Sequence, residues 1–247
     1  MEENEQNTQP VNTTGTETVI NPPSPPPQPS ITTTHHSAPN RAEIAVPPPS
    51  AADDKAFITA LTALVNKVYS QAERGIYRTD FERTSTEDVA ELLRAGEVAV
   101  AYLPPPDADA AVAANSNEDS EVSAQPIPIG CIAMKQVGPS TGEFGMLAVD
   151  PSQRGAGIGG DLVRFAETWC LRRLEQGTTA TGNTVTIQLE LLAPVHFVHA
   201  GKTALQAWYE RLGYARVELR DFRAVYPRLF ELLSGPSEFR VFEKRLC

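Results

Sequence analysis

Seven residues near the middle of the chain, Arg154 to Gly160 (RGAGIGG), constrain its fold more than any other feature. An apolar stretch typical of a strand, 144–149, precedes them, and an amphipathic helical pattern follows over 158–176. Glycines let the backbone turn tightly and approach a ligand, and the free N–H groups at a helix start attract anions. Arg154 can add a charge-assisted hydrogen bond. The sequence therefore predicts a pyrophosphate cradle between a strand and a helix.

A second interpretation of the same loop is a dinucleotide site, because Gly155, Gly157 and Gly160 satisfy the G-x-G-x-x-G fingerprint. Pro151-Ser-Gln-Arg lies between the strand and the first glycine, whereas a dinucleotide-binding fold turns there at once. The acid that should end the next strand about 20 residues on is missing. Only 87 residues follow Gly160, too few for the rest of a doubly wound domain. The dinucleotide interpretation is therefore the weaker one.

The patterns around the loop predict a mixed α/β (α+β) fold, with a central twisted sheet of about six to seven strands flanked by helices. One parallel crossover is expected near the middle of the sheet. Strands are expected at 41–46, 97–103, 127–137, 144–149, 185–192, 214–219 and 239–244. Helices are expected at 52–72, 86–95, 158–176 and 202–212.

Two segments do not fit into this domain. Eleven of the 21 prolines lie in the first 50 residues, where large apolar residues are few. Such a stretch buries too little surface to offset its ordering entropy, so residues 1–40 are expected to be a disordered tail before a domain at 41–247. Residues 104–126 contain five acids and no base, which predicts a flexible acidic insertion on a hairpin.

Composition narrows the range of functions. The net charge of −10, without a basic run, argues against nucleic-acid binding. It tilts slightly towards a cationic acceptor, although solubility is the simpler explanation. Three cysteines, Cys131, Cys170 and Cys247, do not make a disulfide framework. No apolar run reaches the roughly 20 residues that a membrane span needs, and the acidic N-terminus has no secretory signal, so a cytoplasmic or nuclear protein without membrane partners is expected.

Two segments resemble a known family. Residues 147–162 (LAVDPSQRGAGIGGDL) are similar to the acyl-CoA-binding signature of the GNAT superfamily of N-acyltransferases. Its pattern, Arg/Gln-x-x-Gly-x-Gly/Ala, is met by Arg154, Gly157 and Gly159. Residues 207–214 (AWYERLGY) resemble the family's last signature, aromatic–Tyr-x-x-x-Gly-aromatic. Both occur in the right order, which makes the resemblance more specific than either segment alone.

The resemblance implies an N-acetyltransferase with acetyl-CoA as co-substrate and an amine, on a small molecule or a protein, as acceptor. The fourth and fifth strands would splay apart, and the amine would attack the thioester directly in a ternary complex. Cofactor contacts are then expected from Leu147, Ala148, Val149, Arg154, Gly155, Ala156, Gly157, Ile158, Gly159 and Gly160. The same fold could alternatively serve as a non-catalytic acyl-CoA sensor or interaction module.

The resemblance also implies catalytic residues. Tyr209 matches the tyrosine that protonates the departing thiolate in the family, although it could simply be a packed helix aromatic. Glu143, near the start of the fourth strand, is a candidate base, with a solvated glutamate as the alternative. Glu190, flanked by leucines in the fifth strand, is another candidate because desolvation would raise its pKa. A structural ion pair would explain Glu190 equally well.

The acceptor site is harder to predict. Tyr69, Glu73, Tyr77 and Arg83 lie in and after the first helices, in the region that covers the acceptor site in the family, but a surface helix end with a half-buried tyrosine would explain them as well. The stretch 192–202 lacks the family's asparagine near the end of the fifth strand. It offers His196, His199 and Lys202 instead as candidates for acceptor or phosphate contacts, although an ordinary polar loop would explain the two histidines. His-x-x-His has no third ligand nearby, so no metal is expected. The sequence leaves the acceptor and the oligomeric state open.

Overall fold

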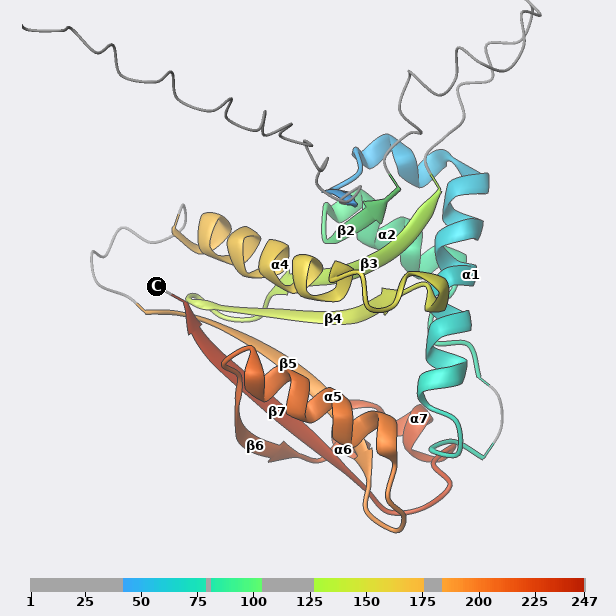
Figure 1. Cartoon of the computed structure of the whole chain (residues 1–247), viewed down its shortest axis with the longest axis vertical. Helices are drawn as coiled ribbons and strands as arrows, with labels where there is room; N and C mark the ends of the chain where they lie inside the picture. The colour runs from blue at the N-terminus through green and yellow to red at the C-terminus, as the bar shows by residue number, and fades with distance from the viewer. Residues whose placement is uncertain (1–41, 79–80, 104–126, 176–183, 247) are drawn as a thin grey trace, which may run out of the picture. The chain divides into compact units, whose positions relative to one another are not determined.

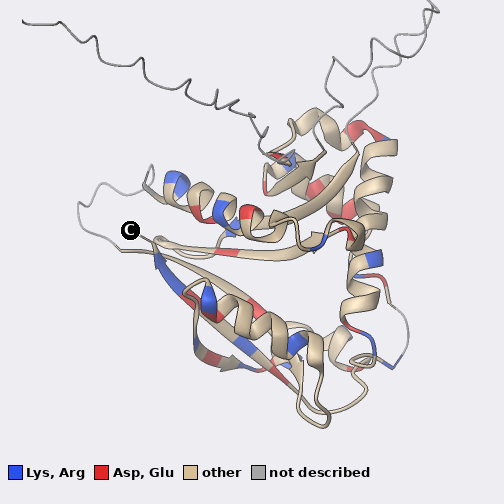
Figure 2. Ribbon diagram, in the orientation of Figure 1, with Lys and Arg blue, Asp and Glu red and all other residues tan. Residues whose placement is uncertain are grey.

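The computed structural model describes residues 42–78, 81–103, 127–175 and 184–246. The predicted tail over 1–40 and the predicted acidic insertion over 104–126 lie outside these residues. No helix in the described ranges is both long and apolar enough to cross a membrane. Lys and Arg are dispersed among Asp and Glu over the described elements (Figure 2).

Within these ranges, seven strands form one mixed sheet, in the order β1-β2-β3-β4-β5-β7-β6 (Figure 1). All neighbours are antiparallel except β4 and β5, which are parallel. The strands are β1 Glu43–Ala45, β2 Val98–Tyr102, β3 Pro128–Gln136, β4 Thr141–Val149, β5 Val185–Pro194, β6 Ala215–Arg220 and β7 Ser237–Leu246. The predicted mixed α/β sheet with one parallel crossover is therefore confirmed.

The helices have local signals at their ends. Asp54 accepts a hydrogen bond from the Phe57 N–H (3.0 Å), so the first helix begins at residue 55 and not at 52. Ser85 and Asp88 form a reciprocal capping box at the second helix. The helices are α1 Lys55–Ala72, α2 Thr86–Ala95, α4 Ile158–Glu175, α5 Ala200–Arg211, α6 Phe222–Val225 and α7 Pro227–Phe230, with 3-10 turns η1 Pro49–Asp53 and η2 Pro151–Gln153.

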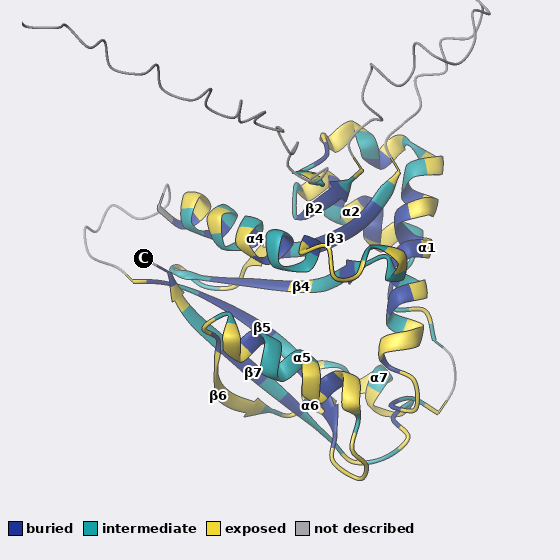
Figure 3. Cartoon of the chain, viewed as in Figure 1, coloured by how far each residue is buried: buried dark blue, intermediate teal, exposed yellow. Residues whose placement is uncertain are grey.

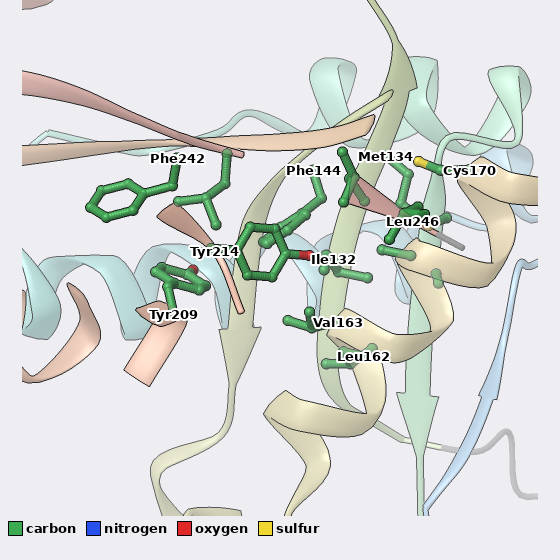
Figure 4. Close-up of a cluster of buried hydrophobic side chains, with 14 of the residues drawn as sticks. Ile132, Met134, Phe144, Leu162, Val163, Cys170, Tyr209, Tyr214, Phe242 and Leu246 are labelled. Carbon is green, nitrogen blue, oxygen red and sulfur yellow. The ribbon is translucent and has the colours of Figure 1, made fainter. Parts of the chain in front are cut away.

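Helices cover both faces of the sheet because alternate strand residues point to opposite sides. Ala99 and Ile132 pack with α4 on one face, and Val98 and Cys131 pack with α1 and α2 on the other. Figure 3 shows the resulting pattern of buried strands and half-exposed helices, and Figure 4 shows the cluster that holds α4 and α5 against the strands. The two apolar layers fix where α1, α4 and α5 lie around β4.

The predicted splay between the fourth and fifth strands is also present. β4 and β5 pair only from Thr141 to Glu143 and from Thr186 to Gln188, although both strands continue for six residues beyond. Figure 1 shows the two strands meeting at one end and separating towards α1. β5 then pairs along its whole length with β7, which holds it away from β4. The sheet therefore opens at its centre.

Candidate active site

A cavity of about 300 Å³ lies in the opening between β4 and β5. Its walls come from α1, α2, α5 and α6 as well as from strands β3, β4, β5 and β7. Five of the residues singled out in the sequence for catalysis or substrate binding line it: Tyr69, Tyr77, Glu143, Glu190 and Tyr209. Leu147, predicted to contact the cofactor, lines it as well. The fold thus brings together residues that lie up to 140 positions apart in the chain.

Tyr209 lies on α5 with only 5% of its surface exposed. Its ring packs against Phe144 of β4, with centroids 6.0 Å apart, and against its neighbour Trp208. Figure 4 shows Tyr209 and Tyr214 beside Phe144 in the same cluster. Burial raises the pKa of the Tyr209 phenol well above its ordinary value, so the hydroxyl keeps its proton at neutral pH. Tyr209 can therefore act as a proton donor within the cavity.

Glu143 and Glu190 bring two carboxylates to the cavity, each with a basic partner. Glu143 is buried, and its two oxygens bind Lys135 Nζ (2.8 Å) and Gln188 Nε2 (2.6 Å). Glu190 accepts a hydrogen bond from Arg220 Nη1 (2.6 Å). Desolvation raises the pKa of Glu190, and the nearby charge of Glu143 raises it further. Of the two carboxylates, Glu190 is therefore the better placed to take up a proton.

A backbone distortion marks the part of β4 that lines the cavity. Met146 has φ +46°, in the left-handed region that non-glycine residues rarely adopt. The register between β3 and β4 shifts at the same level, between Cys131 and Ala133, as in a β-bulge. The Cys131 thiol lies 3.7 Å from the Met146 carbonyl oxygen. Such strain is held by the surrounding packing and is concentrated at functional sites.

The three predicted cofactor residues of β4 follow this distortion. Ala148 and Val149 pair with β3 on one side, opposite Cys131 and Gly130. On the other side, β5 does not pair with β4 beyond Glu143. The β4 backbone there has no ladder partner from β5, which suits hydrogen bonds to an extended ligand with amide groups.

The glycine loop lies at the end of β4 and starts α4. Gly155 and Gly157 have φ of +87° and +83°, and nothing lies within 4 Å of where a Cβ would be at either position. Their glycine identity is thus required by the backbone turn and leaves open space for a ligand. Residues 154–157 are exposed, and α4 begins at Ile158, which directs the first N–H groups of the helix towards this space. The loop therefore has the geometry of an anion cradle.

The turn before the glycine loop is anchored by Asp150. Its Oδ1 accepts hydrogen bonds from the backbone N–H and the hydroxyl of Ser152, and its Oδ2 pairs with Lys67 of α1 at 3.0 Å. These bonds, led by the Ser152 N–H, lower the pKa of Asp150 to about 2. The sequence Asp-Pro before the loop thus fixes where the loop starts relative to α1.

Tyr69 and Tyr77 lie on the side of the cavity formed by α1 and the segment after it. The guanidinium carbon of Arg83 stacks 5.0 Å above the Tyr69 ring. Tyr77 forms a β-bridge with Leu233, and the Arg78 N–H donates to the Leu232 carbonyl at 2.8 Å. This bridge joins the segment after α1 to the segment after α7, so the two segments close one side of the cavity together.

His199 is not part of the cavity lining. It caps α5 instead: its Nδ1 accepts a hydrogen bond from the Lys202 N–H at 3.2 Å. His196 lies against the Pro236 carbonyl oxygen at 3.1 Å. The structure therefore gives the histidines of this stretch local structural contacts and offers no support for His199 as an acceptor contact. Among the described residues, no group of three His, Cys, Asp or Glu side chains is arranged as a metal site.

Several cavity residues were not predicted from the sequence. α6 and α7 were not expected at all; Phe222 of α6 and Tyr226, between the two helices, line the cavity. The aromatic spacing in 222–230 is the signal that could have revealed them. Glu73 and Lys202 were candidates for the acceptor side, but their buried ion pair at 3.0 Å, with each side chain only 8% exposed, was not predicted. Nothing local in the sequence connects these two residues, because 129 positions separate them.

Residues 112–216 match the family model described as the acetyltransferase (GNAT) domain. This range includes both sequence signatures, at 147–162 and 207–214, and the predicted resemblance to the GNAT superfamily is confirmed. The part outside the match contains α1, α2, α6 and β7, which supply much of the cavity wall. No curated protein sequence matches the chain significantly.

Solved structures share the fold. The chain is similar to an aminoglycoside 6′-N-acetyltransferase complexed with coenzyme A, with 17% identity, a TM-score of 0.50 and coverage of 82% of this chain and 96% of that one. It is similar to the PaiA N-acetyltransferase from Thermoplasma acidophilum in complex with coenzyme A, with 16% identity, a TM-score of 0.50 and coverage of 83% of this chain and 99% of that one. It is also similar to an acetyltransferase of the GNAT family from Staphylococcus aureus Mu50, with 14% identity, a TM-score of 0.50 and coverage of 83% of this chain and 99% of that one. At these identities the comparison shows a common fold.

Proposed function

We propose that this chain is an N-acetyltransferase that moves an acetyl group from acetyl-CoA to an amine, because residues 112–216 match the acetyltransferase (GNAT) domain. The observation that carries this proposal is the cavity between β4 and β5, which places Tyr209 together with Glu143 and Glu190 beside the unpaired part of β4. Two of the similar solved structures contain coenzyme A, which supports acetyl-CoA as the co-substrate.

The residues at the end of β4 fit this co-substrate. The pyrophosphate would lie on the backbone N–H groups of Arg154–Gly160 at the start of α4, where the glycines leave space and the helix dipole favours negative charge. The pantetheine amides would pair with β4 near Leu147 and Val149, where β5 has moved away. The thioester end would then reach the cavity, whose lining includes Leu147.

The residues of the cavity supply the proton transfers. The acceptor nitrogen attacks the thioester carbonyl carbon, so a C–N bond forms and the C–S bond breaks. Glu190 takes the proton that the nitrogen loses, directly or through a water, because its raised pKa makes it a stronger base than an ordinary carboxylate. Tyr209 gives its proton to the departing sulfur and regains one from solvent. The products are the acetylated amine and the free CoA thiol.

Glu143 has a different part in this proposal. Both of its oxygens already have partners, Lys135 and Gln188, and it lies opposite Gln188 where β4 and β5 separate. Its hydrogen bond from Gln188 links β4 to β5 at this point, and its negative charge helps to raise the pKa of Glu190. Glu143 remains the second candidate base.

The test is an acetyl-transfer assay with the full chain, acetyl-CoA and a panel of amines, in which thiol release and the mass of the acetylated product are measured together. We expect both signals to appear in equal amounts. Binding of acetyl-CoA without transfer to any amine would instead favour the non-catalytic acyl-CoA sensor. Absence of acetyl-CoA binding would contradict both functions.

A further inference from the structure

The acceptor side of the cavity contains a positive charge without an ionic partner. Of the ionisable groups in the cavity wall, Glu73 pairs with Lys202 and Glu143 pairs with Lys135. Glu190 pairs with Arg220 from outside the wall. The wall itself holds three acids and three bases, and Arg220 also pairs with Glu218 at 3.2 Å. In the described part of the chain, Arg83 forms no ion pair with a carboxylate, and its guanidinium lies over the Tyr69 ring.

The neighbouring tyrosines do not neutralise Arg83. Burial raises the pKa of Tyr69 to about 12, and burial likewise raises the pKa of Tyr77 above its ordinary value. Both phenols are therefore uncharged at neutral pH. Glu73 lies in the same wall, but Lys202 already holds one of its oxygens at 3.0 Å. Among the described residues of the wall, Arg83 is therefore the cationic side chain without a carboxylate partner.

Tyr226, between α6 and α7, lines the cavity together with Arg83 and Glu190. These side chains share one cavity of about 300 Å³, which favours a small ligand.

The closed side of the cavity also limits the size of the acceptor. Besides the Tyr77–Leu233 bridge, the Ser234 N–H donates to the Ile76 carbonyl (2.8 Å), and the Ser234 hydroxyl donates to the Gly75 carbonyl (2.6 Å). A second, more open hollow of about 470 Å³ shares Glu143, Glu190 and Tyr226 with the cavity, and so offers a way in. A compact molecule fits this arrangement better than a folded protein chain.

We propose that the acceptor is a small amine that also carries an anionic oxygen group, a carboxylate or a phosphate, which binds Arg83 while its nitrogen faces Glu190 and Tyr209. The planar guanidinium can bind such a group through two parallel hydrogen bonds. In its reactive form the amine is neutral, so the molecule carries only the negative charge of its carboxylate or phosphate, which is opposite in sign to the charge of Arg83. The overall acidity of the chain would point the other way, towards a cationic acceptor. This inference rests on the proposed acetyltransferase function and names its acceptor class.

The experiment compares matched acceptors at saturating acetyl-CoA with the full chain. The panel contains α-, β- and γ-amino carboxylates, their carboxamides, aminoalkyl phosphates, the matching amino alcohols and linear diamines. The variants are Arg83→Gln, Arg83→Lys and, as a matched control, Arg94→Gln, which removes an exposed arginine at the end of α2 outside the cavity. Affinity for acetyl-CoA is measured for every variant, so that a folding defect is recognised.

We expect kcat/KM for a carboxylate or phosphate acceptor to exceed that of its uncharged counterpart by at least about tenfold, as a hydrogen bond to a charged group allows. Arg83→Gln should remove this preference through KM, Arg83→Lys should keep part of it, and Arg94→Gln should keep all of it. The carboxylate and phosphate arms identify which anion binds. Equal rates with uncharged amines or a preference for diamines would overturn the inference. Acetyl-CoA binding without transfer to any member of the panel, or no acetyl-CoA binding by the unaltered protein, would instead overturn the proposed function.

Discussion

The glycine loop and the acceptor side of the cavity lie at the two ends of the same opening, yet they are built differently. The loop is one continuous segment, 150–160, which offers backbone N–H groups through glycines with positive φ. The acceptor side is made of side chains from α1, α2, α5 and α6, and its charges are held by ion pairs between distant residues. Backbone N–H groups can bind the same ligand in any member of a fold, whatever its side chains are. Binding by side chains, in contrast, can change with the substrate.

This difference predicts which substitutions affect the cofactor and which affect the acceptor. Substitutions in the loop should change affinity for acetyl-CoA, because the backbone there is the binding surface. Substitutions on the acceptor side should change KM for the amine or the rate of proton transfer and leave affinity for acetyl-CoA unaltered. An acceptor-side substitution that lowered affinity for acetyl-CoA, or a loop substitution that changed only KM for the amine, would contradict this difference between the two regions.

The largest effect is expected for Gly157→Glu. A side chain at φ +83° is strained, and a carboxylate would fill the space next to the expected pyrophosphate with negative charge. We expect affinity for acetyl-CoA to fall by more than about 1,000-fold, equivalent to roughly 4 kcal/mol, in a calorimetric titration. Gly157→Ala and Gly96→Ala are the matched controls. Both place a side chain at a positive φ, which is +65° at Gly96, but Gly96 ends α2 away from the loop. Gly96→Ala therefore reports backbone strain alone, and Gly157→Ala reports strain at the expected ligand contact. If both alanine variants lowered affinity equally, the loop would have no special role.

The second effect concerns stability and tests how the acceptor side is held together. Lys202→Met leaves the buried Glu73 carboxylate without its ionic partner, and the other oxygen of that carboxylate already has no hydrogen-bond partner among the described residues. We expect the free energy of unfolding to fall by about 3 kcal/mol, measured by urea denaturation. The double variant Glu73→Gln/Lys202→Met should recover part of this loss. A single variant as stable as the unaltered protein would show that the pair does not join α1 to α5.

The third effect separates chemistry from binding on α5. Tyr209→Phe removes the proposed proton donor and should lower kcat by about 100-fold, with little change in affinity for acetyl-CoA. Tyr214→Phe is the matched control, because Tyr214 packs on the same phenylalanine but donates its hydroxyl to Glu167 (2.8 Å) and does not line the cavity. Equal losses for the two variants would indicate packing as the cause.

The smallest effect is a change in the pH profile. Burial and the charge of Glu143 raise the pKa of Glu190, while Arg220 and Lys135 lower it, and the net direction is upward. Since a base must be deprotonated, kcat/KM should increase with pH through a pKa above the ordinary value for glutamate of about 4.3 and then level off. Glu190→Gln should lower kcat/KM by about tenfold and abolish this increase of kcat/KM with pH. If Glu143→Gln abolished it instead, the roles of the two carboxylates would be exchanged.

The sequence predicted the glycine loop and its flanking strand and helix well, because their determinants are local. The Arg154–Gly160 loop, its preceding strand and α4 follow one another directly, so spacing alone indicated their arrangement. The same holds for α2, whose predicted bounds match the structure because Ser85 and Gly96 mark both ends. The parallel contact between β4 and β5 followed from the strand–helix–strand order.

The acceptor side could not be predicted to the same extent, because its determinants are far apart in the sequence. The Glu73–Lys202 pair and the bridge between Tyr77 and Leu233 depend on how α5 and α7 return to α1. α6 and α7 contain only four residues each, too short to produce a helical repeat. His199 was a candidate because the stretch 192–202 lacks the family's asparagine, and the structure gives its Nδ1 a local hydrogen bond from the Lys202 N–H.

Calorimetric titration of the full chain with acetyl-CoA and, separately, with NAD decides between the two interpretations of the glycine loop. We expect micromolar binding of acetyl-CoA, loss of that binding in Gly157→Glu, and no heat with NAD. Binding of NAD without binding of acetyl-CoA would rule out the acyl-CoA cradle and restore the dinucleotide interpretation of the loop.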